Sequence, residues 1–131
     1  MTFQAAEIAI QQRLRDNWTT TPISYDNSDF SAQNDVPYIH LSVIDGFASQ
    51  VDWGKPTNTY RHLGVIVCQI FVPIGVGTGL AKGYADSIAA IWRSARFSGI
   101  TCLTPRVEKV GEIGSWFQIN VTVDFRRDEI F

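Results

Sequence analysis

Residues 63–72 constrain the fold more than any other segment, because they read as one long strand with two apolar faces. Successive side chains of a strand point to opposite faces, so odd and even positions form separate rows. The two rows are Leu63, Val65, Val67, Gln69 and Phe71 on one face, and Gly64, Ile66, Cys68, Ile70 and Val72 on the other. A strand in a sheet with one face in water has apolar residues on one side only. This strand therefore needs a cover on both faces, either a second layer of the chain's own helices or another subunit.

Length and composition indicate one globular domain spanning residues 1–131. A chain of 131 residues is too short to give each of two halves a separate core. Apolar residues make up 45% of the chain and charged residues 18%, which is typical of a globular protein. The formal net charge of −2 disfavours specific nucleic-acid binding and attachment to acidic membranes. Without a signal-peptide pattern or a membrane-spanning apolar run, we expect a soluble protein made in the cytoplasm.

Two segments have the periodicity of amphipathic helices. In the first, Thr2 is placed to cap a helix that ends near Asn17. Its apolar positions recur at helical spacing: Phe3, Ala6, Ile10 and Leu14. The second follows the glycines of residues 75–79 and is expected to end between Phe97 and Gly99. Its apolar stripe is Leu80, Tyr84, Ile88, Trp92 and Ala95.

The remaining apolar segments read as strands. Ile23–Tyr25 is a candidate short strand, and a longer one begins after Pro37, with a bulge expected at Gly46. Residues 53–58 read as a hairpin tip that returns into the long apolar strand. The last strand has the clearest alternation, with Phe117, Ile119, Val121, Val123 and Phe125 facing inward. These elements predict an α+β fold in which two main helices pack on a mostly antiparallel sheet, in the order helix, β-hairpin, helix, β-hairpin.

The glycine-rich turn at residues 75–79 is the one motif that imitates a cofactor site. A strand, a glycine turn and a helix N-terminus form the usual setting for phosphate binding. In a Walker-type loop a glycine stands directly before the lysine, whereas here Lys82 follows Ala81 and no hydroxyl residue follows it. The pattern therefore favours a plain strand-to-helix turn, and we expect no cofactor; a small ligand-binding module using Gly75 to Gly79 stays as the alternative.

The residues suited to catalysis or metal binding do not form a recognised pattern. His40 and His62 have no cysteine or carboxylate at metal-ligand spacing, so we expect no metal. Cys68 and Ser42 lie within strands, where a nucleophile lacks an activated and exposed setting. Cys68 and Cys102 are better explained as buried free thiols of a reducing compartment. The sequence predicts a protein that is not an enzyme and has no catalytic residues.

The hairpin tip is the strongest candidate for a functional surface. It combines Trp53, Lys55, Tyr60 and Arg61 with polar loop residues, and aromatic residues and arginine are the usual anchors of protein interfaces. The plainer alternative is that Trp53 and Tyr60 pack against each other across the hairpin. The mixed charges of residues 126–129 are interpreted as a solvated end of the chain.

Several apolar, glycine and proline positions give the chain a resemblance to the tail terminator, or tail completion, proteins of tailed bacteriophages. They are Asn34–Ile39, Arg61–Gly64, Phe71–Pro73 followed by Gly75 and Gly77, and Ala85–Ile88. The resemblance extends from the first helix to the last strand.

The resemblance implies a structural virion protein of a phage or prophage. Such a protein assembles in the host cytoplasm as a ring, usually of six copies, at the head-proximal end of the tail tube, and becomes part of the virion tail. The ring stops growth of the tube and allows the head to join. The implied partners are copies of itself, the tail tube protein and the head–tail connector protein; a connector or neck protein is the alternative within the same class.

Overall fold

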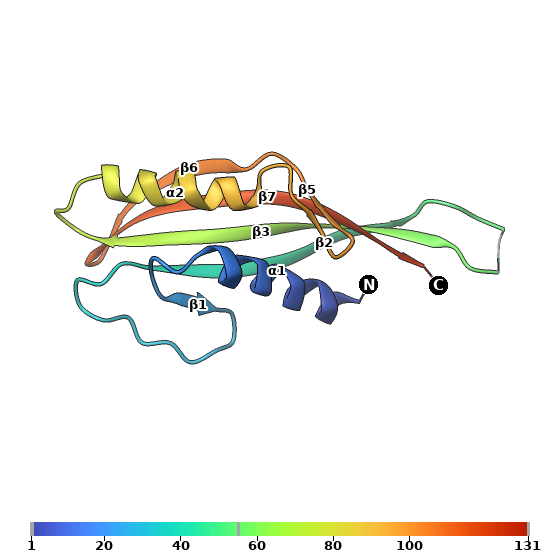
Figure 1. The fold of residues 1–131 in the computed structure, drawn as a ribbon, viewed down its shortest axis with the longest axis horizontal. Helices are drawn as coiled ribbons and strands as arrows, with labels where there is room; N and C mark the ends of the chain where they lie inside the picture. The colour runs from blue at the N-terminus through green and yellow to red at the C-terminus, as the bar shows by residue number, and fades with distance from the viewer. Residues whose placement is uncertain (1, 55, 131) are drawn as a thin grey trace.

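The computed structural model describes residues 2–54 and 56–130 as one two-layer α+β unit. Within these residues the chain forms two helices and a seven-stranded sheet (Figure 1). The elements are α1 (Phe3–Asn17), β1 (Ile23–Tyr25), β2 (Tyr38–Gln50), β3 (Thr59–Pro73), α2 (Gly79–Trp92), β4 (Arg96–Phe97), β5 (Ile100–Cys102), β6 (Arg106–Ile113) and β7 (Trp116–Ile130). No helix among the described residues is long and apolar enough to cross a membrane.

The sheet is built around the antiparallel pair β3–β7. The two strands stay in register over their whole length, from Thr59 opposite Ile130 to Pro73 opposite Trp116. β2 pairs antiparallel with the other edge of β3, and β1 adds to β2 in parallel. β5 and β6 both pair with β7 at different positions, and β4 pairs with β5. The predicted class is therefore right, and the candidate strand Ile23–Tyr25 is confirmed as β1. The simple order helix, β-hairpin, helix, β-hairpin is not confirmed, because β1 and the β4–β5 hairpin add to it.

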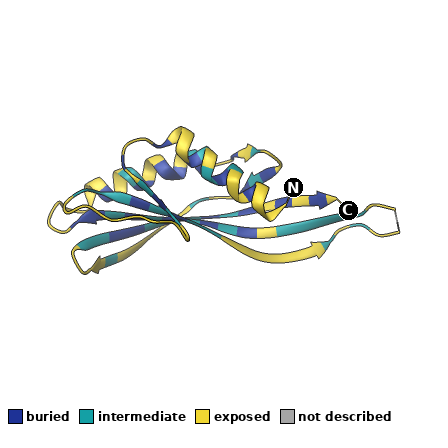
Figure 2. Cartoon of the chain, turned by 90° about the horizontal axis from the view of Figure 1, so that it is seen from below, coloured by how far each residue is buried: buried dark blue, intermediate teal, exposed yellow. Residues whose placement is uncertain are grey.

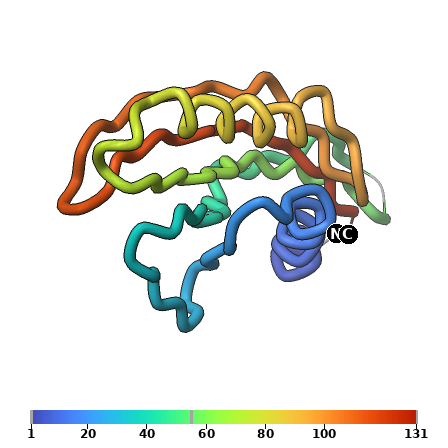
Figure 3. Tube along the Cα trace, turned by 60° about the vertical axis from the view of Figure 1, so that its left-hand side comes forward, coloured from blue at the N-terminus to red at the C-terminus, as the bar shows by residue number. Residues whose placement is uncertain are grey.

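Both helices cover the same face of the sheet. Figure 2 shows the two helices on one side and bare strands on the other, and Figure 3 shows that α1 and α2 lie over different strands. Along β3 the even-numbered residues from Gly64 to Val72 are buried, and the odd-numbered ones are only partly covered. The second apolar face of this strand thus receives no helix from its own chain.

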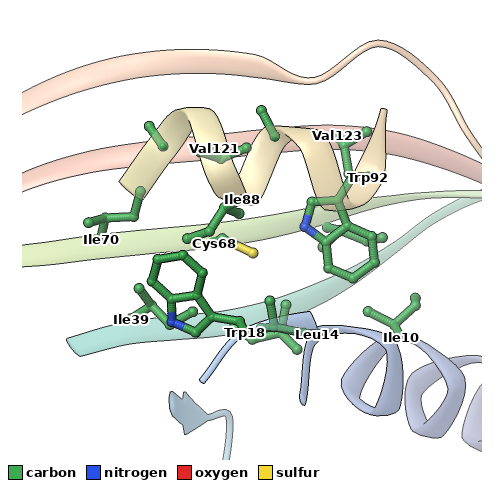
Figure 4. Close-up of a cluster of buried hydrophobic side chains, with 14 of the residues drawn as sticks. Ile10, Leu14, Trp18, Ile39, Cys68, Ile70, Ile88, Trp92, Val121 and Val123 are labelled. Atoms are coloured by element: carbon green, nitrogen blue, oxygen red, sulfur yellow. The ribbon is translucent and has the colours of Figure 1, made fainter. Parts of the chain in front are cut away.

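A single core lies between the helices and this covered face. Trp92 of α2 is fully buried and lies beside Cys68 and Ile88 (Figure 4). Leu14 and Trp18 close the core from the side of α1, where the indole N–H of Trp18 donates a hydrogen bond to Thr21 Oγ1 at 2.9 Å. As predicted, both cysteines are free and buried. Burial raises the pKa of the Cys68 thiol to about 12 and that of Cys102 to about 11.

The predicted first helix is confirmed in its bounds and its cap. The Thr2 side chain accepts a hydrogen bond from the Ala5 backbone N–H at 3.1 Å, and Ala6, Ile10 and Leu14 form the buried stripe. Phe3, predicted to belong to this stripe, is half exposed. Its ring instead lies at the edge of the core, over the end of the sheet.

The second helix ends earlier than its sequence pattern suggests. α2 stops at Trp92, because Arg93 is extended and Ser94 takes a left-handed backbone conformation with φ 54°. The short β4–β5 hairpin then occupies the residues predicted to continue the helix. Leu80 is exposed, and the buried stripe is made mostly of alanines: Ala81, Ala85, Ile88, Ala89 and Trp92.

The chain end after Phe125 is not a solvated tail. β7 continues to Ile130 and stays paired with β3, so the inward alternation of the last strand extends through Arg127 and Glu129. Arg127 is 1% exposed and Glu129 8%. Two charged residues thus occupy positions of the covered face, where they meet polar and aromatic partners of the adjacent strand and of α1.

Candidate functional site

The sheet extends well beyond the helices at one end, and we call this extension the arm. It comprises residues 44–54 of β2 and the following turn, residues 59–63 of β3 and residues 126–130 of β7. Figure 1 shows it projecting away from both helices, with the C-terminal strand beside it. The backbone N–H of Thr59 donates a hydrogen bond to the Asp52 carboxylate and so closes the base of the turn.

A β-bulge shapes the arm. Asp45 pairs with Gly64 and Ala48 with His62, so that Gly46 and Phe47 together lie opposite Leu63. This confirms the bulge expected at Gly46. A bulge disrupts the ladder of an edge strand and bends it locally. It also leaves Phe47 70% exposed, an unusual state for a phenylalanine within a strand.

Large apolar side chains gather toward the end of the arm. Trp53 is 74% exposed and Ile130 69%, and Val51, between Trp53 and the bulge, is 44% exposed. Contiguous exposed apolar side chains of this size mark interaction sites in proteins. The arm therefore has the character of a docking element.

The four residues predicted at the interface do not form one surface. Trp53 lies on the exposed turn, and Lys55 lies outside the described residues. Tyr60 and Arg61 are neighbours in β3, so their side chains point to opposite faces of the sheet. Tyr60 lies on the helix-facing side with His62, where a hollow of about 450 Å³ is lined by Ala48, Ser49, Gln50, Tyr60 and His62.

Arg61 is held by the neighbouring strand. Its Nε and Nη2 donate to Asp128 Oδ1 and Oδ2 at 2.9 and 3.2 Å, a two-point contact across the β3–β7 ladder. The hydrogen bond from Arg61 lowers the pKa of the Asp128 carboxyl. Arg61 therefore contributes to the stiffness of the arm as well as to its charge.

A charged cluster fixes the root of the arm to α1. His62 Nε2 lies 3.1 Å from Glu129 Oε2, and Arg127 Nη1 lies 3.7 Å from the same oxygen. The Phe3 ring contacts both side chains: its centroid lies 4.5 Å from Arg127 Cζ, and it meets the His62 ring edge to face at 5.2 Å between centroids. The first turn of α1 is thereby tied to the sheet where the arm begins.

A groove runs along the outer side of α1, between this helix and β4. It has a volume of about 530 Å³ and is lined by Ala5, Ile8, Ala9, Gln12, Arg13, Asp16, Asn17, Phe97 and Ser98. Arg13 forms its far wall, because its Nε and Nη2 donate to the Ile91 carbonyl at 3.0 and 2.8 Å. The guanidinium also stacks 4.9 Å from the centroid of the Phe97 ring. The alternation of alanines and Ile8 gives the groove an apolar floor.

The glycine turn does not have the chemistry of a phosphate site. Gly75 and Gly77 have left-handed φ values of 94° and 82°, which explains the glycines by backbone conformation alone. The small hollow beside the turn, about 290 Å³, includes Glu112 in its lining. A carboxylate at this place repels a phosphate, so the helix N-terminus of α2 is a poor anion site.

His40 does meet a carboxylate, although the two are distant in sequence. His40 Nδ1 lies 2.8 Å from Ser24 Oγ and its Nε2 2.9 Å from Asp26 Oδ1, and Ser42 donates to the same Asp26 oxygen at 2.9 Å. The set has the composition of a hydrolase triad, but Ser24 is only 8% exposed within β1. Ser24 and His40 do line a hollow of about 350 Å³, whose other lining residues include Phe30, Tyr38 and Phe71. The evident role of the set is to tie the loop after β1 to β2.

Sequence reasoning missed the residues that the structure brings forward. The sequence pattern predicts Phe47 only as part of a strand that continues beyond Gly46, and no pattern singles out Ile130. The groove joins α1 to residues 97–98, about ninety positions away, and no local pattern predicts such a contact. One sequence feature does indicate the groove. α1 has a second row of small and apolar residues beside its buried stripe, made of Ala5, Ile8 and Ala9.

Comparisons with known proteins agree with this architecture. The family model described as "Phage tail terminator protein" matches residues 6–125. Among solved structures, 13 chains match. One of them has a TM-score of 0.73 and 17% sequence identity, and the alignment covers 97% of this chain and 96% of that chain. At this identity the likeness concerns the fold. None of the curated proteins matches the sequence.

Proposed function

The chain belongs to the phage tail terminator protein family, and from this membership we propose that it forms a ring at the head-proximal end of the phage tail tube. The family is one of phage structural proteins, which makes the chain a component of a phage tail. In the proposed role the ring stops tube growth and provides the surface to which the head is joined. We propose that the ring has six copies and assembles in the host cytoplasm, before the tail becomes part of the virion.

The observation that carries the ring is the apolar end of the arm. Phe47, Trp53 and Ile130 are each about 70% exposed or more in the single chain, and covering such a patch favours association. The arm lies at one end of an elongated subunit (Figure 1). We propose that it contacts a different surface of the neighbouring copy. Contacts between two different surfaces run head to tail, and they make a ring when the rotation between copies closes.

Termination follows from such a ring without bond chemistry. The face of the ring that meets the tail tube protein has to match the last tube ring, whereas the opposite face offers a different surface. A further tube subunit then finds no docking site, and growth stops. The opposite face is left for the head–tail connector protein.

The proposal is tested first by the mass of the free protein. Multi-angle light scattering over a wide concentration range, with negative-stain imaging, is expected to show closed rings of six copies. A protein that stays monomeric at every concentration, and also in the presence of tube protein, contradicts the ring.

Complementation of a phage lacking this gene separates termination from head joining. Without the protein we expect tails of excessive and variable length. Tails of normal length that fail to attach heads indicate a connector role instead.

The predicted arm residues are tested in the same assay. A Trp53→Ala, Arg61→Ala double variant, and separately Lys55→Ala and Tyr60→Ala, are expected to reduce the yield of completed tails. Completion at the wild-type level by the double variant shows that these side chains do not contribute to assembly.

A further inference from the structure

The groove beside α1 has the properties of a preformed recess for an apolar side chain. Its floor alternates small and large residues, with Ala5 and Ala9 one helical turn apart and Ile8 between them. Ile8 is 57% exposed, although it points along a face that already carries apolar neighbours. Phe97 and the stacked Arg13 form a fixed opposite wall. The recess therefore exists before a partner binds, and this lowers the entropy that is lost when side chains become ordered on binding.

The arm supplies a projection of matching chemistry. Phe47 stands out at the bulge and Trp53 at the turn, and they are 70% and 74% exposed in the single chain. Aromatic side chains bury about 150–250 Å² each and dominate interface energetics. A volume of about 530 Å³ is in the range of well-formed binding pockets, roughly 300–1,000 Å³, and it has room for such side chains.

The polar surroundings of the two surfaces are compatible. Gln12, Asp16 and Asn17 border the groove, and Ser49 and Gln50 border the exposed part of the arm. These side chains are mostly uncharged donors and acceptors, which suit the rim of an interface with an apolar centre. Neither surface presents a block of like charges to the other.

The groove and arm of one chain cannot engage each other. The arm projects away from the helical layer, and Phe3, Arg127 and Glu129 pin its root to α1 (Figure 1). The projection and the recess are thus two different patches on one subunit, held apart by a stiff sheet. Two such patches satisfy each other only between copies, in the head-to-tail arrangement that closes rings.

We propose that the α1–β4 groove of each subunit receives the apolar end of the arm of a second copy of this chain, with Phe47 or Trp53 inserted between Ala5, Ile8 and Phe97. This inference rests on the proposed ring and names the two surfaces that join its subunits. The tube protein is the competing occupant of either surface, but a tube contact alone leaves one of the two apolar patches of this chain uncovered.

Site-directed cross-linking tests the pairing. One population carries Ile8→Cys and a mass tag, and the other carries Phe47→Cys; a further pair uses Trp53→Cys. Mixed rings treated with a short bis-maleimide are expected to yield a tagged–untagged dimer, which can arise only between copies. The native Cys68 and Cys102 do not interfere, since both are buried. Glu7→Cys, on an exposed position of α1 outside the groove lining, replaces Ile8→Cys as the matched control and is expected to give little of this product.

Filling the groove gives a second readout. Ala5→Trp places a large side chain in the recess from an exposed position and leaves the buried stripe of α1 intact. It is expected to raise the concentration needed for half assembly by roughly tenfold or more, as for the loss of one aromatic hot spot. Glu7→Trp adds the same side chain outside the groove and is expected to assemble as the wild type does.

The possible results separate the two levels of the proposal. Rings that form in the wild type, give no dimer with either arm cysteine and tolerate Ala5→Trp overturn the pairing while the ring stands. A wild-type protein that forms no rings removes the ring, and the pairing with it. A cross-link from Phe47→Cys to the tube protein in place of a second copy also overturns the pairing.

Discussion

Gly64 of β3 lies directly opposite Phe125 of β7, and the Phe125 ring fills the space that a side chain at position 64 would occupy. A Cβ atom added to Gly64 would lie 2.5 Å from Phe125 Cζ and 3.0 Å from the Ile44 carbonyl oxygen. Gly64 thus lets an aromatic ring of the core pack flat on the backbone, at the place where the covered sheet gives way to the arm.

We expect Gly64→Ala to destabilise the protein by about 1–3 kcal/mol, because the added methyl group displaces the Phe125 ring from a packed position. The free energy of unfolding, measured by urea denaturation, checks this. Gly83→Ala is the matched control, since Gly83 is exposed in the middle of α2 and nothing lies within 4 Å of an added Cβ. That variant should gain about 0.5–1 kcal/mol from helix propensity. Equal effects of the two substitutions would contradict the close contact.

The two tryptophans Trp92 and Trp53 should separate folding from assembly. Trp92→Ala removes a fully buried ring and is expected to cost about 3–5 kcal/mol of folding stability. Trp53→Ala changes an exposed ring and should alter the stability of the monomer by no more than about 0.5 kcal/mol. Thermal unfolding of dilute protein measures the first effect, and light scattering at high concentration measures the loss of assembly expected for the second. A large loss of monomer stability in Trp53→Ala would place its ring in the core instead.

The thiols should be inert in the folded protein. Burial raises the pKa of Cys68 to about 12 and of Cys102 to about 11, so that at about pH 8 almost no thiolate is present. Cys68 is fully buried and Cys102 is 5% exposed, which also restricts the access of reagents. A disulfide reagent is expected to modify neither thiol until the protein is unfolded by denaturant, and then to modify both. Phe47→Cys serves as the positive control, because its thiol would react at once. Fast modification of two thiols in the native wild type would refute this packing.

The Arg61–Asp128 pair should make a small, pH-dependent contribution to stability. Because Arg61 lowers the pKa of folded Asp128, the unfolded chain binds the proton more tightly, and the contribution is present above the ordinary aspartate pKa and lost as pH falls through the folded value. We expect Asp128→Asn to be slightly less stable than the wild type at neutral pH, with the difference vanishing at acidic pH. Both side chains are partly exposed, so added salt should also shrink the difference. A difference that persists in acid would assign the effect to packing.

Local patterns in the sequence predicted those elements that local interactions determine. Thr2 caps α1, the glycine turn precedes α2, and the alternation from Phe117 to Phe125 places one face of β7 in the core. The bulge at Gly46 and the burial of both cysteines were likewise readable. In each case the signal lies within a few residues of the feature.

The errors have physical reasons that involve distant parts of the chain. α2 appears longer in sequence because Ala95 and Phe97 continue its spacing, but Ser94 leaves the helical conformation and β5 supplies a strand for β4 to pair with. Residues 126–129 look like a solvated end because Arg127 and Glu129 are charged, and only their pairing with β3 and α1 shows why they are buried. The groove requires knowledge of where β4 lies beside α1.

The interface predicted at Trp53, Lys55, Tyr60 and Arg61 stays a prediction. Trp53 does lie at an exposed turn, whereas Tyr60 and Arg61 point to opposite faces, and Lys55 lies outside the described residues. The apolar character of the arm depends on Phe47 and Ile130, which become neighbours of the turn only through the registers of β2 and β7 with β3.

The unbroken β3–β7 ladder makes the subunit stiff along its length. Fifteen residue pairs join the arm to the end of the sheet next to the glycine turn, and strands held side by side in this way resist sliding along their length. The bulge interrupts only β2, the outer strand of the arm. The subunit is therefore stiff from the arm to the glycine turn, and a contact that fixes the position of the arm also fixes the orientation of the opposite end of the sheet.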